Sequence, residues 1–145
     1  IDLSERAVRL AEENAVINFG SEVAHKAIAC NAVEYLKDID SDYDLIILDP
    51  PAFAKHHKVL GNALQGYKKI NARALEKIAP GGILFTFSCS QAVSRDLFRT
   101  TIFTAAAIAR RKVRIIGQLT QPADHPINIY HPEGEYLKGL VVYVE

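Results

Sequence analysis

Apolar residues recur along the chain in helical and extended patterns that alternate. Ser4 is a favourable N-cap, and apolar residues then recur at helical spacing as far as Phe19, after which Gly20 ends the helix. The remaining pattern predicts, in chain order, a strand at 23–30, a helix at 32–39, a strand at 43–48, a helix at 67–78, a strand at 83–87, a helix at 94–110, and strands at 113–119 and 140–144.

Two of the predicted strands are unbroken apolar runs. Residues 43–48 read Tyr-Asp-Leu-Ile-Ile-Leu, and residues 83–87 read Ile-Leu-Phe-Thr-Phe. Such runs are typical of strands that are buried on both faces of a parallel sheet. No helix separates the last two strands, so we expect them to pair antiparallel. The pattern predicts an open, doubly wound α/β sheet that is mostly parallel and ends in a C-terminal antiparallel hairpin.

Length and composition are those of one globular domain. The chain has 145 residues, of which 49% are hydrophobic, so we expect a single domain over residues 1–145. Its formal net charge is zero, so contacts with a nucleic acid would come from local patches of charge. Two cysteines without a disulfide pattern indicate a reduced, cytoplasmic setting, and no apolar run approaches membrane-spanning length.

Three polar residues follow predicted strands at the carboxyl edge of the sheet, where open α/β sheets bind ligands. They are Asp2, Asp49 and Cys89. Asp2 comes directly after what looks like the end of a strand, and an acid at that point suits the ribose hydroxyls of a nucleotide. The alternative is an ordinary acidic residue just before the N-cap Ser4.

Residues 49–53, Asp-Pro-Pro-Ala-Phe, are the most informative stretch of the sequence. The two prolines fix their φ angles and remove two backbone donors, so the chain leaves the strand in a stiff, extended turn. Such a turn can hold a flat base, with Phe53 as a stacking surface. The alternative is a strand terminator followed by an aromatic residue of the core.

Cys89 ends the next buried strand, just ahead of a helix, within the sequence Ser-Cys-Ser. Helix amides and local positive charge can activate a thiol at such a position. Buried cysteines more often serve as small hydrophobic residues, and we assign Cys30 to packing.

The motifs at 49–53, 81–84 and 88–90 together resemble class I S-adenosylmethionine-dependent methyltransferases. The resemblance is strongest to the bacterial ribosomal RNA large-subunit methyltransferase I group, which forms 5-methylcytosine. It runs along nearly the whole chain and includes residues 14–18, 66–68, 123–126, 132–134 and 136–139. Many amino-group methyltransferases share Asp-Pro-Pro, but its combination with Ser-Cys-Ser and Asp-His-Pro is more specific.

The resemblance implies the cofactor S-adenosylmethionine, an RNA substrate, and a role for each matched residue. The cofactor would be bound by Asp2, Asn31, Asp49 and Pro50. Asn31 stands where the family usually has an acid, and its amide oxygen would accept a hydrogen bond from the adenine amino group. The target base would be bordered by Pro51 and by the loop that contains His125. Cys89 would be the nucleophile, and Asp49 would act as an acid at ring nitrogen N3.

A small basic cluster, residues 55–58, follows the Asp-Pro-Pro turn. Lys55 could contact RNA phosphates, and a solvated charged surface is the alternative. His56 and His57 are adjacent but have no further ligands at metal-binding spacing, so no metal is expected.

The resemblance also implies parts that the chain does not contain. The chain does not begin with Met, and both the glycine-rich loop beneath the cofactor and an RNA-binding PUA domain would precede Ile1. We therefore expect a fragment without its first strand that alone binds cofactor weakly or not at all, and an open sheet edge that could create a homodimer. Three other classes remain open: an amino-group methyltransferase, a dinucleotide oxidoreductase and a non-catalytic interaction module.

Overall fold

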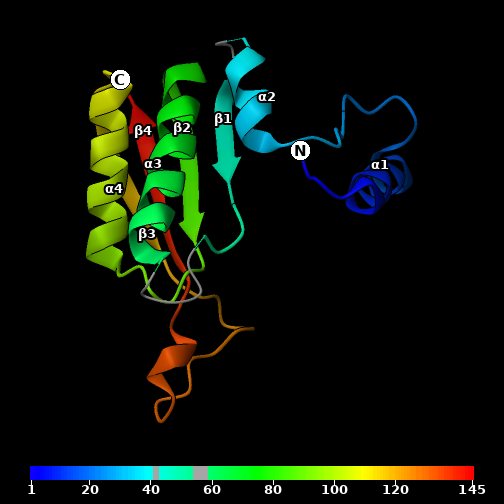
Figure 1. The fold of residues 1–145 in the computed structure, drawn as a ribbon. Coiled ribbons are helices and arrows are strands. Elements are labelled where there is room, and N and C mark those ends of the chain that lie inside the picture. Colours follow the sequence, from blue (N-terminus) through cyan, green and yellow to red (C-terminus); the bar gives the residue numbers. More distant parts are fainter. Residues whose placement is uncertain (41–42, 54–58) are drawn as a thin grey trace. The chain divides into compact units, whose positions relative to one another are not determined.

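The computed structural model describes residues 1–40, 43–53 and 59–145 (Figure 1). Lys55 and the rest of its basic cluster up to position 58 therefore lie outside the described residues. The chain divides into two compact units, Ile1–Ile39 and Asp40–Glu145, which are described separately below. Within the described residues, no helix has both the length and the apolar character needed to cross a membrane.

The first unit contains the helices α1, Glu5–Phe19, and α2, Ala32–Asp38. The Ser4 hydroxyl accepts a hydrogen bond from the Ala7 amide at 3.3 Å, and Gly20 ends α1 with a φ of 86°. That positive φ is the reason for a glycine at this position, since other residues rarely adopt it. Both predicted helices are confirmed.

The strand predicted at 23–30 is wrong, because the segment forms only one isolated parallel bridge, between Asp2 and Ala29. The Asp2 amide donates to the Ile28 carbonyl at 3.2 Å, and the Cys30 amide donates to the Asp2 carbonyl at 2.9 Å. The rest of the segment is held by a side chain, since the Glu12 carboxylate of α1 accepts from the amide of Ala27 and contacts His25. A strand needs pairing over several residues, which the described partners do not provide.

The second unit contains a four-stranded sheet in the order β1-β2-β4-β3. Its strands are β1 Tyr43–Leu48, β2 Ile78–Ser88, β3 Val113–Leu119 and β4 Lys138–Val144. β1 pairs parallel with β2, whereas β4 pairs antiparallel with both β2 and β3. The α/β class and the C-terminal antiparallel hairpin are confirmed. The expectation of a mostly parallel sheet is only partly met, because β4 lies between two strands that run in the opposite direction.

The helices α3, Leu60–Lys77, and α4, Arg95–Ile108, pack side by side over one face of this sheet (Figure 1). Under them lie fully buried side chains from the helices and from the two central strands: Tyr67, Leu75, Leu84, Phe98, Val142 and Val144. This core fixes the positions of the loops that follow β1 and β2.

Two elements begin earlier than the sequence pattern predicts. Helix α3 begins at Leu60 and not near Tyr67, because packing of its apolar face outweighs the low helix propensity of Gly61 and Gly66. Strand β2 begins at Ile78, and an irregularity in its pairing with β1 accommodates Pro-Gly-Gly at 80–82, which was expected to end the helix.

The opposite face of the sheet is not covered by a helix of the second unit. Residues alternate along β1: Leu45 and Ile47 are 50% and 61% exposed, whereas Ile46 and Leu48 are buried. The expectation that this strand is buried on both faces is therefore wrong. An unbroken apolar run indicates that both faces of the strand are hydrophobic, but it does not indicate whether a helix packs on each face.

Candidate active site

Asp49 and Cys89 lie at the same edge of the sheet. Strands β1 and β2 are neighbours, run in the same direction and pair up to Leu48 and Thr86, so their carboxyl ends meet (Figure 1). Asp49 follows β1 directly and is exposed, and Cys89 follows β2 directly and is half-buried. The structure therefore brings together a carboxylate and a thiol where α/β sheets bind their ligands.

The Asp-Pro-Pro turn begins at this edge, and Phe53 at its end contacts helix α3. Pro50 is buried, Pro51 is exposed, and the half-buried ring of Phe53 lies edge-on to the ring of Tyr67, with 4.7 Å between centroids. Gly66 makes this contact possible, because a Cβ there would lie 3.2 Å from Phe53 Cδ2. Phe53 thus anchors the turn on helix α3, and its role as a stacking surface for a base stays a prediction.

A buried polar network lies beneath Cys89. Both flanking serines, Ser88 and Ser90, are fully buried, and the Ser90 amide donates to Ser88 Oγ at 3.3 Å. The Tyr67 hydroxyl is 2.9 Å from Ser90 Oγ, and its ring also packs edge-on against Phe98. Tyr67 therefore contacts both the turn after β1, through Phe53, and the turn after β2, through Ser90.

Lys138, the first residue of β4, completes this network and was not singled out from the sequence. Its side chain is only 7% exposed, and its Nζ donates to the carbonyls of Ser90 at 2.6 Å and Val93 at 2.7 Å. Desolvation by burial lowers the pKa of Lys138, the charge of Cys89 raises it, and the charge of Arg95 lowers it. The signal that could have found it is the alternation along β4, where 138, 140, 142 and 144 share the buried face.

Asp2 and Asn31 lie in the first unit, next to the isolated bridge. The exposed Asp2 carboxylate accepts a hydrogen bond from the Ser4 amide at 2.7 Å. Asn31 is the N-cap of α2, and its Oδ1 accepts from the amides of Val33 at 2.9 Å and Glu34 at 3.4 Å. The amide oxygen expected to meet adenine is therefore already engaged by the helix.

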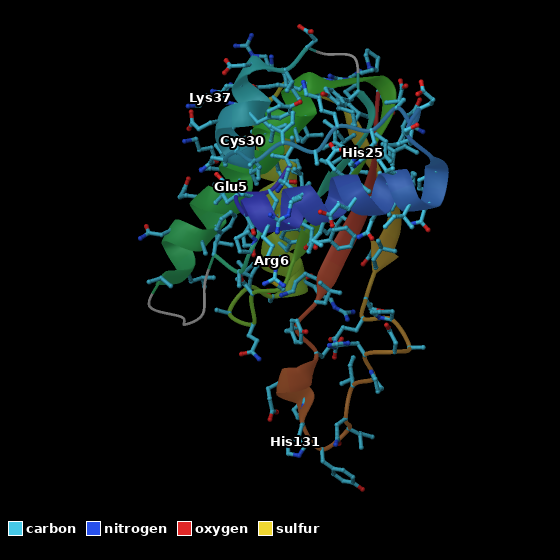
Figure 2. The ribbon with its side chains drawn as sticks, turned by 90° about the vertical axis from the view of Figure 1, so that its right-hand side faces the viewer. Glu5, Arg6, His25, Cys30, Lys37 and His131 are labelled. Atoms are coloured by element: carbon cyan, nitrogen blue, oxygen red, sulfur yellow. The ribbon has the colours of Figure 1, made fainter. Side chains whose placement is uncertain are left out.

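Cys30 precedes α2 in the same unit (Figure 2) and is a free thiol, as Cys89 is. Its amide is held by the bridge to Asp2, and it is half-buried. Within the described residues, no group of three or more His, Cys, Asp or Glu side chains could hold a metal ion.

His125 lies exposed in the long loop between β3 and β4, where its amide donates to the Pro122 carbonyl at 3.0 Å. This loop, which carries His131 far from the sheet (Figure 2), is tied back to the segment after Cys89. Gln91 donates to the Glu133 carbonyl at 3.1 Å, and Arg95 forms an ion pair with Glu135. The loop is therefore connected to the Cys89 side of the sheet edge, although His125 itself takes no part in the network beneath the thiol.

Solved structures share this fold, and two of them are described as proposed methyltransferases. SMU.776, a proposed methyltransferase crystallised as its complex with SAH, matches 98% of the chain with a TM-score of 0.79 and 21% identity. TrmN from Thermus thermophilus matches 99% of the chain with a TM-score of 0.63 and 16% identity. The alignments cover 37% and 35% of those two chains. The fold is accordingly that of the S-adenosylmethionine-dependent methyltransferases.

The chain is also similar in sequence to curated proteins. Ribosomal RNA large subunit methyltransferase I of Shewanella denitrificans is 40% identical over 148 residues, and that of Aeromonas hydrophila is 42% identical over 147. The matches cover 99% and 98% of this chain but only 37% and 36% of those proteins. The family resemblance indicated by the motifs is thus confirmed for a chain that spans about a third of its relatives. No model of a known protein family matches it.

Proposed function

We propose that the protein containing this chain is an S-adenosylmethionine-dependent methyltransferase that modifies carbon 5 of a cytosine in ribosomal RNA. The names of its relatives support methyl transfer to ribosomal RNA. The choice of carbon 5 is carried by one observation, a half-buried thiol at the carboxyl end of β2 beside the exposed Asp49 at the end of β1. Methylation of an amino group needs no thiol at this position.

The cofactor supplies a methyl group on a positively charged sulfur. In the first unit, Asp2 fits the role of ribose ligand, because its carboxylate is exposed and a single hydrogen bond from Ser4 leaves it acceptor capacity. Asn31 would bind adenine through its amide nitrogen, since its oxygen caps α2. In the second unit, Asp49 and Pro50 border the place where the methyl group is transferred.

Carbon 5 of cytosine is a poor nucleophile, so the proposed reaction begins with covalent activation. The Cys89 sulfur forms a bond to carbon 6, while Asp49 acts as the acid at ring nitrogen N3. Electron density gathered at carbon 5 then takes the methyl group, and the methyl–sulfur bond of the donor breaks to leave a neutral thioether. Finally, a base removes the proton from carbon 5 and the bond between carbon 6 and Cys89 breaks.

The RNA would be held by local contacts, because the chain has a formal net charge of zero. Pro51, the half-buried ring of Phe53 and the exposed loop that contains His125 are candidates to contact the RNA, and Phe53 also packs against Tyr67. Lys55 is proposed from the sequence alone as a phosphate contact. Two free cysteines and a ribosomal RNA substrate fit a reduced cytoplasm. A homodimer and a single domain over residues 1–145 stay predictions.

The experiment uses the full-length protein, S-adenosylmethionine with a labelled methyl group, and ribosomal RNA from cells that lack the enzyme. The RNA is digested to nucleosides, and mass spectrometry distinguishes 5-methylcytidine from cytidine methylated on its amino group. We expect 5-methylcytidine, its loss in Cys89→Ala, and its retention in the matched control Cys30→Ala. Methyl transfer that survives Cys89→Ala, or a label on an amino group, would reject the carbon 5 assignment and support an amino-group methyltransferase.

A further inference from the structure

A buried lysine without a carboxylate partner lies beneath the candidate nucleophile. Lys138 is 7% exposed, and among the described residues no carboxylate forms an ion pair with it. Its hydrogen-bond acceptors are the two carbonyls of Ser90 and Val93. Lysine is almost never buried to this extent without a paired charge, because removing an ammonium group from water is costly.

The position of this ammonium group is unfavourable for reasons besides burial. Val93 directly precedes Ser94, the N-cap of the 14-residue helix α4, so the lysine lies near the positive end of a helix dipole. The neighbouring cation Arg95 opposes its protonation, and desolvation does so more strongly. Of the groups whose charge acts on Lys138, Cys89 is the one that favours the protonated form. A positive charge near a thiol is a general feature of reactive cysteines.

Lys138 also fixes the backbone that carries the thiol. Its Nζ joins the carbonyls at both ends of the 90–93 turn, and the Val93 amide also donates to the Ser90 carbonyl at 3.2 Å. In the sheet, Lys138 pairs with Ser88, the residue before Cys89. The side chain of Lys138 therefore contacts the turn that follows Cys89, while the backbone of Lys138 pairs with the strand that precedes Cys89.

We propose that Lys138 is a positioning residue for Cys89, whose ammonium group holds the turn that follows the thiol and places a positive charge near it. The proposal rests on the proposed function, in which Cys89 is the nucleophile. A thiolate attacks carbon 6 of cytosine far faster than a thiol. Among the described residues, the titratable groups that act on Lys138 are Cys89, which follows β2, and Arg95 of α4, and Arg95 is itself paired with Glu135.

The test measures alkylation of Cys89 by iodoacetamide as a function of pH in the full-length protein, without RNA or cofactor. Mass spectrometry of the peptide that contains Cys89 gives its rate, and the peptide that contains Cys30 gives an internal control. Two variants remove the charge: Lys138→Met also removes the donors, whereas Lys138→Gln keeps an amide that can donate to the carbonyls. Tyr67→Phe is the matched control, because it removes a hydrogen bond to Ser90 without changing any charge at neutral pH.

We expect both Lys138 variants to move the alkylation profile of Cys89 to higher pH, which lowers the rate at neutral pH by about tenfold for each unit of displacement. Tyr67→Phe should leave the midpoint of the profile unchanged, and Cys30 should respond to none of these variants. A Lys138→Gln protein that folds and alkylates with the wild-type midpoint would overturn the proposal. Should Lys138→Met fail to fold, Lys138→Gln still decides the question.

The alkylation assay and the methyl-transfer assay test the role of Lys138 and the proposed function separately. A displaced alkylation profile together with methyl transfer that survives Cys89→Ala would reject the proposed function while supporting the coupling of Lys138 to the thiol. Loss of methyl transfer in Cys89→Ala together with an unchanged alkylation profile in Lys138→Gln would support the nucleophile and reject the role of Lys138.

Discussion

In Gly66→Ala, a gain in helix propensity in α3 competes with steric crowding of the Phe53 ring. Alanine within a helix is favoured over glycine by about 1 kcal/mol. At this position, however, the new Cβ would lie 3.2 Å from Phe53 Cδ2 and 3.4 Å from its Cε2 and Cγ. These contacts are a few tenths of an ångström too short, so the ring must move. Phe53 is only half-buried and lies on a turn, so its displacement costs less than crowding in a closed core.

We therefore expect Gly66→Ala to change the free energy of unfolding by less than about 1 kcal/mol, because the gain in helix propensity offsets the crowding. Catalysis should suffer more than stability, since Phe53 anchors the turn that begins at Asp49. Misplacing that turn by a fraction of an ångström should raise KM for RNA and lower kcat by about 10-fold. Urea unfolding gives the first quantity, and steady-state methyl transfer by the full-length protein gives the second.

Gly61→Ala is the matched control in the same helix. A Cβ at Gly61 meets no atom within 4 Å, so this variant gains helix propensity without touching Phe53. It should be at least as stable as the wild type and fully active. If Gly66→Ala had wild-type kcat and KM, the inference that Phe53 positions the Asp49 turn would be refuted.

Three further predictions concern stability. The pKa of Glu12 is lowered, first by the hydrogen bond from the Ala27 amide and then by His25, so this contact stabilises the fold at pH values above the ordinary pKa of 4.5 and is lost as the pH falls through the lowered pKa. Glu12→Gln should therefore destabilise the protein at neutral pH and progressively less in acid, and thermal unfolding at several pH values measures this. Thr86→Val removes a buried hydroxyl that has no hydrogen-bond partner among the described residues, and urea unfolding should show a free energy of unfolding that is unchanged or higher by up to about 1 kcal/mol. In Gly139→Ala the new Cβ would lie 2.6 Å from the ring of Phe87, and the same assay should show a loss of about 1–3 kcal/mol.

Periodicity predicted most of the fold because packing and local chemistry agree in most elements. Helix α1 is bounded by Ser4 and Gly20, and both residues act as the sequence pattern predicts. The sequence-based prediction is wrong where strand pairing or burial depends on distant parts of the chain. Residues 23–30 have the composition of a strand, but in the described part of the chain Asp2 alone pairs with them. The position of β4 between β2 and β3 likewise depends on long-range pairing that no local pattern contains.

The candidate site was predictable as far as chain position determines it. Asp49 and Cys89 follow neighbouring parallel strands, so strand order alone brings them to one edge. The network beneath them was not predictable, because Tyr67 and Lys138 come from α3 and β4 and meet only at Ser90. In the sequence, Tyr67 is an apolar helix position and Lys138 an ordinary strand-end charge. Their polar atoms acquire a role through burial, which depends on the packed structure.

The most direct test of covalent chemistry at Cys89 uses RNA in which the target cytosine is replaced by 5-fluorocytosine. Fluorine cannot leave carbon 5 as a proton does, so the final step is blocked and the enzyme remains bonded to its substrate. With S-adenosylmethionine, the full-length protein and its Cys30→Ala variant should form an adduct that survives a denaturing gel, and peptide mapping should locate the bond at Cys89. Absence of the adduct in a preparation that methylates ordinary RNA, or an adduct at another residue, would contradict the assignment of Cys89 as the nucleophile.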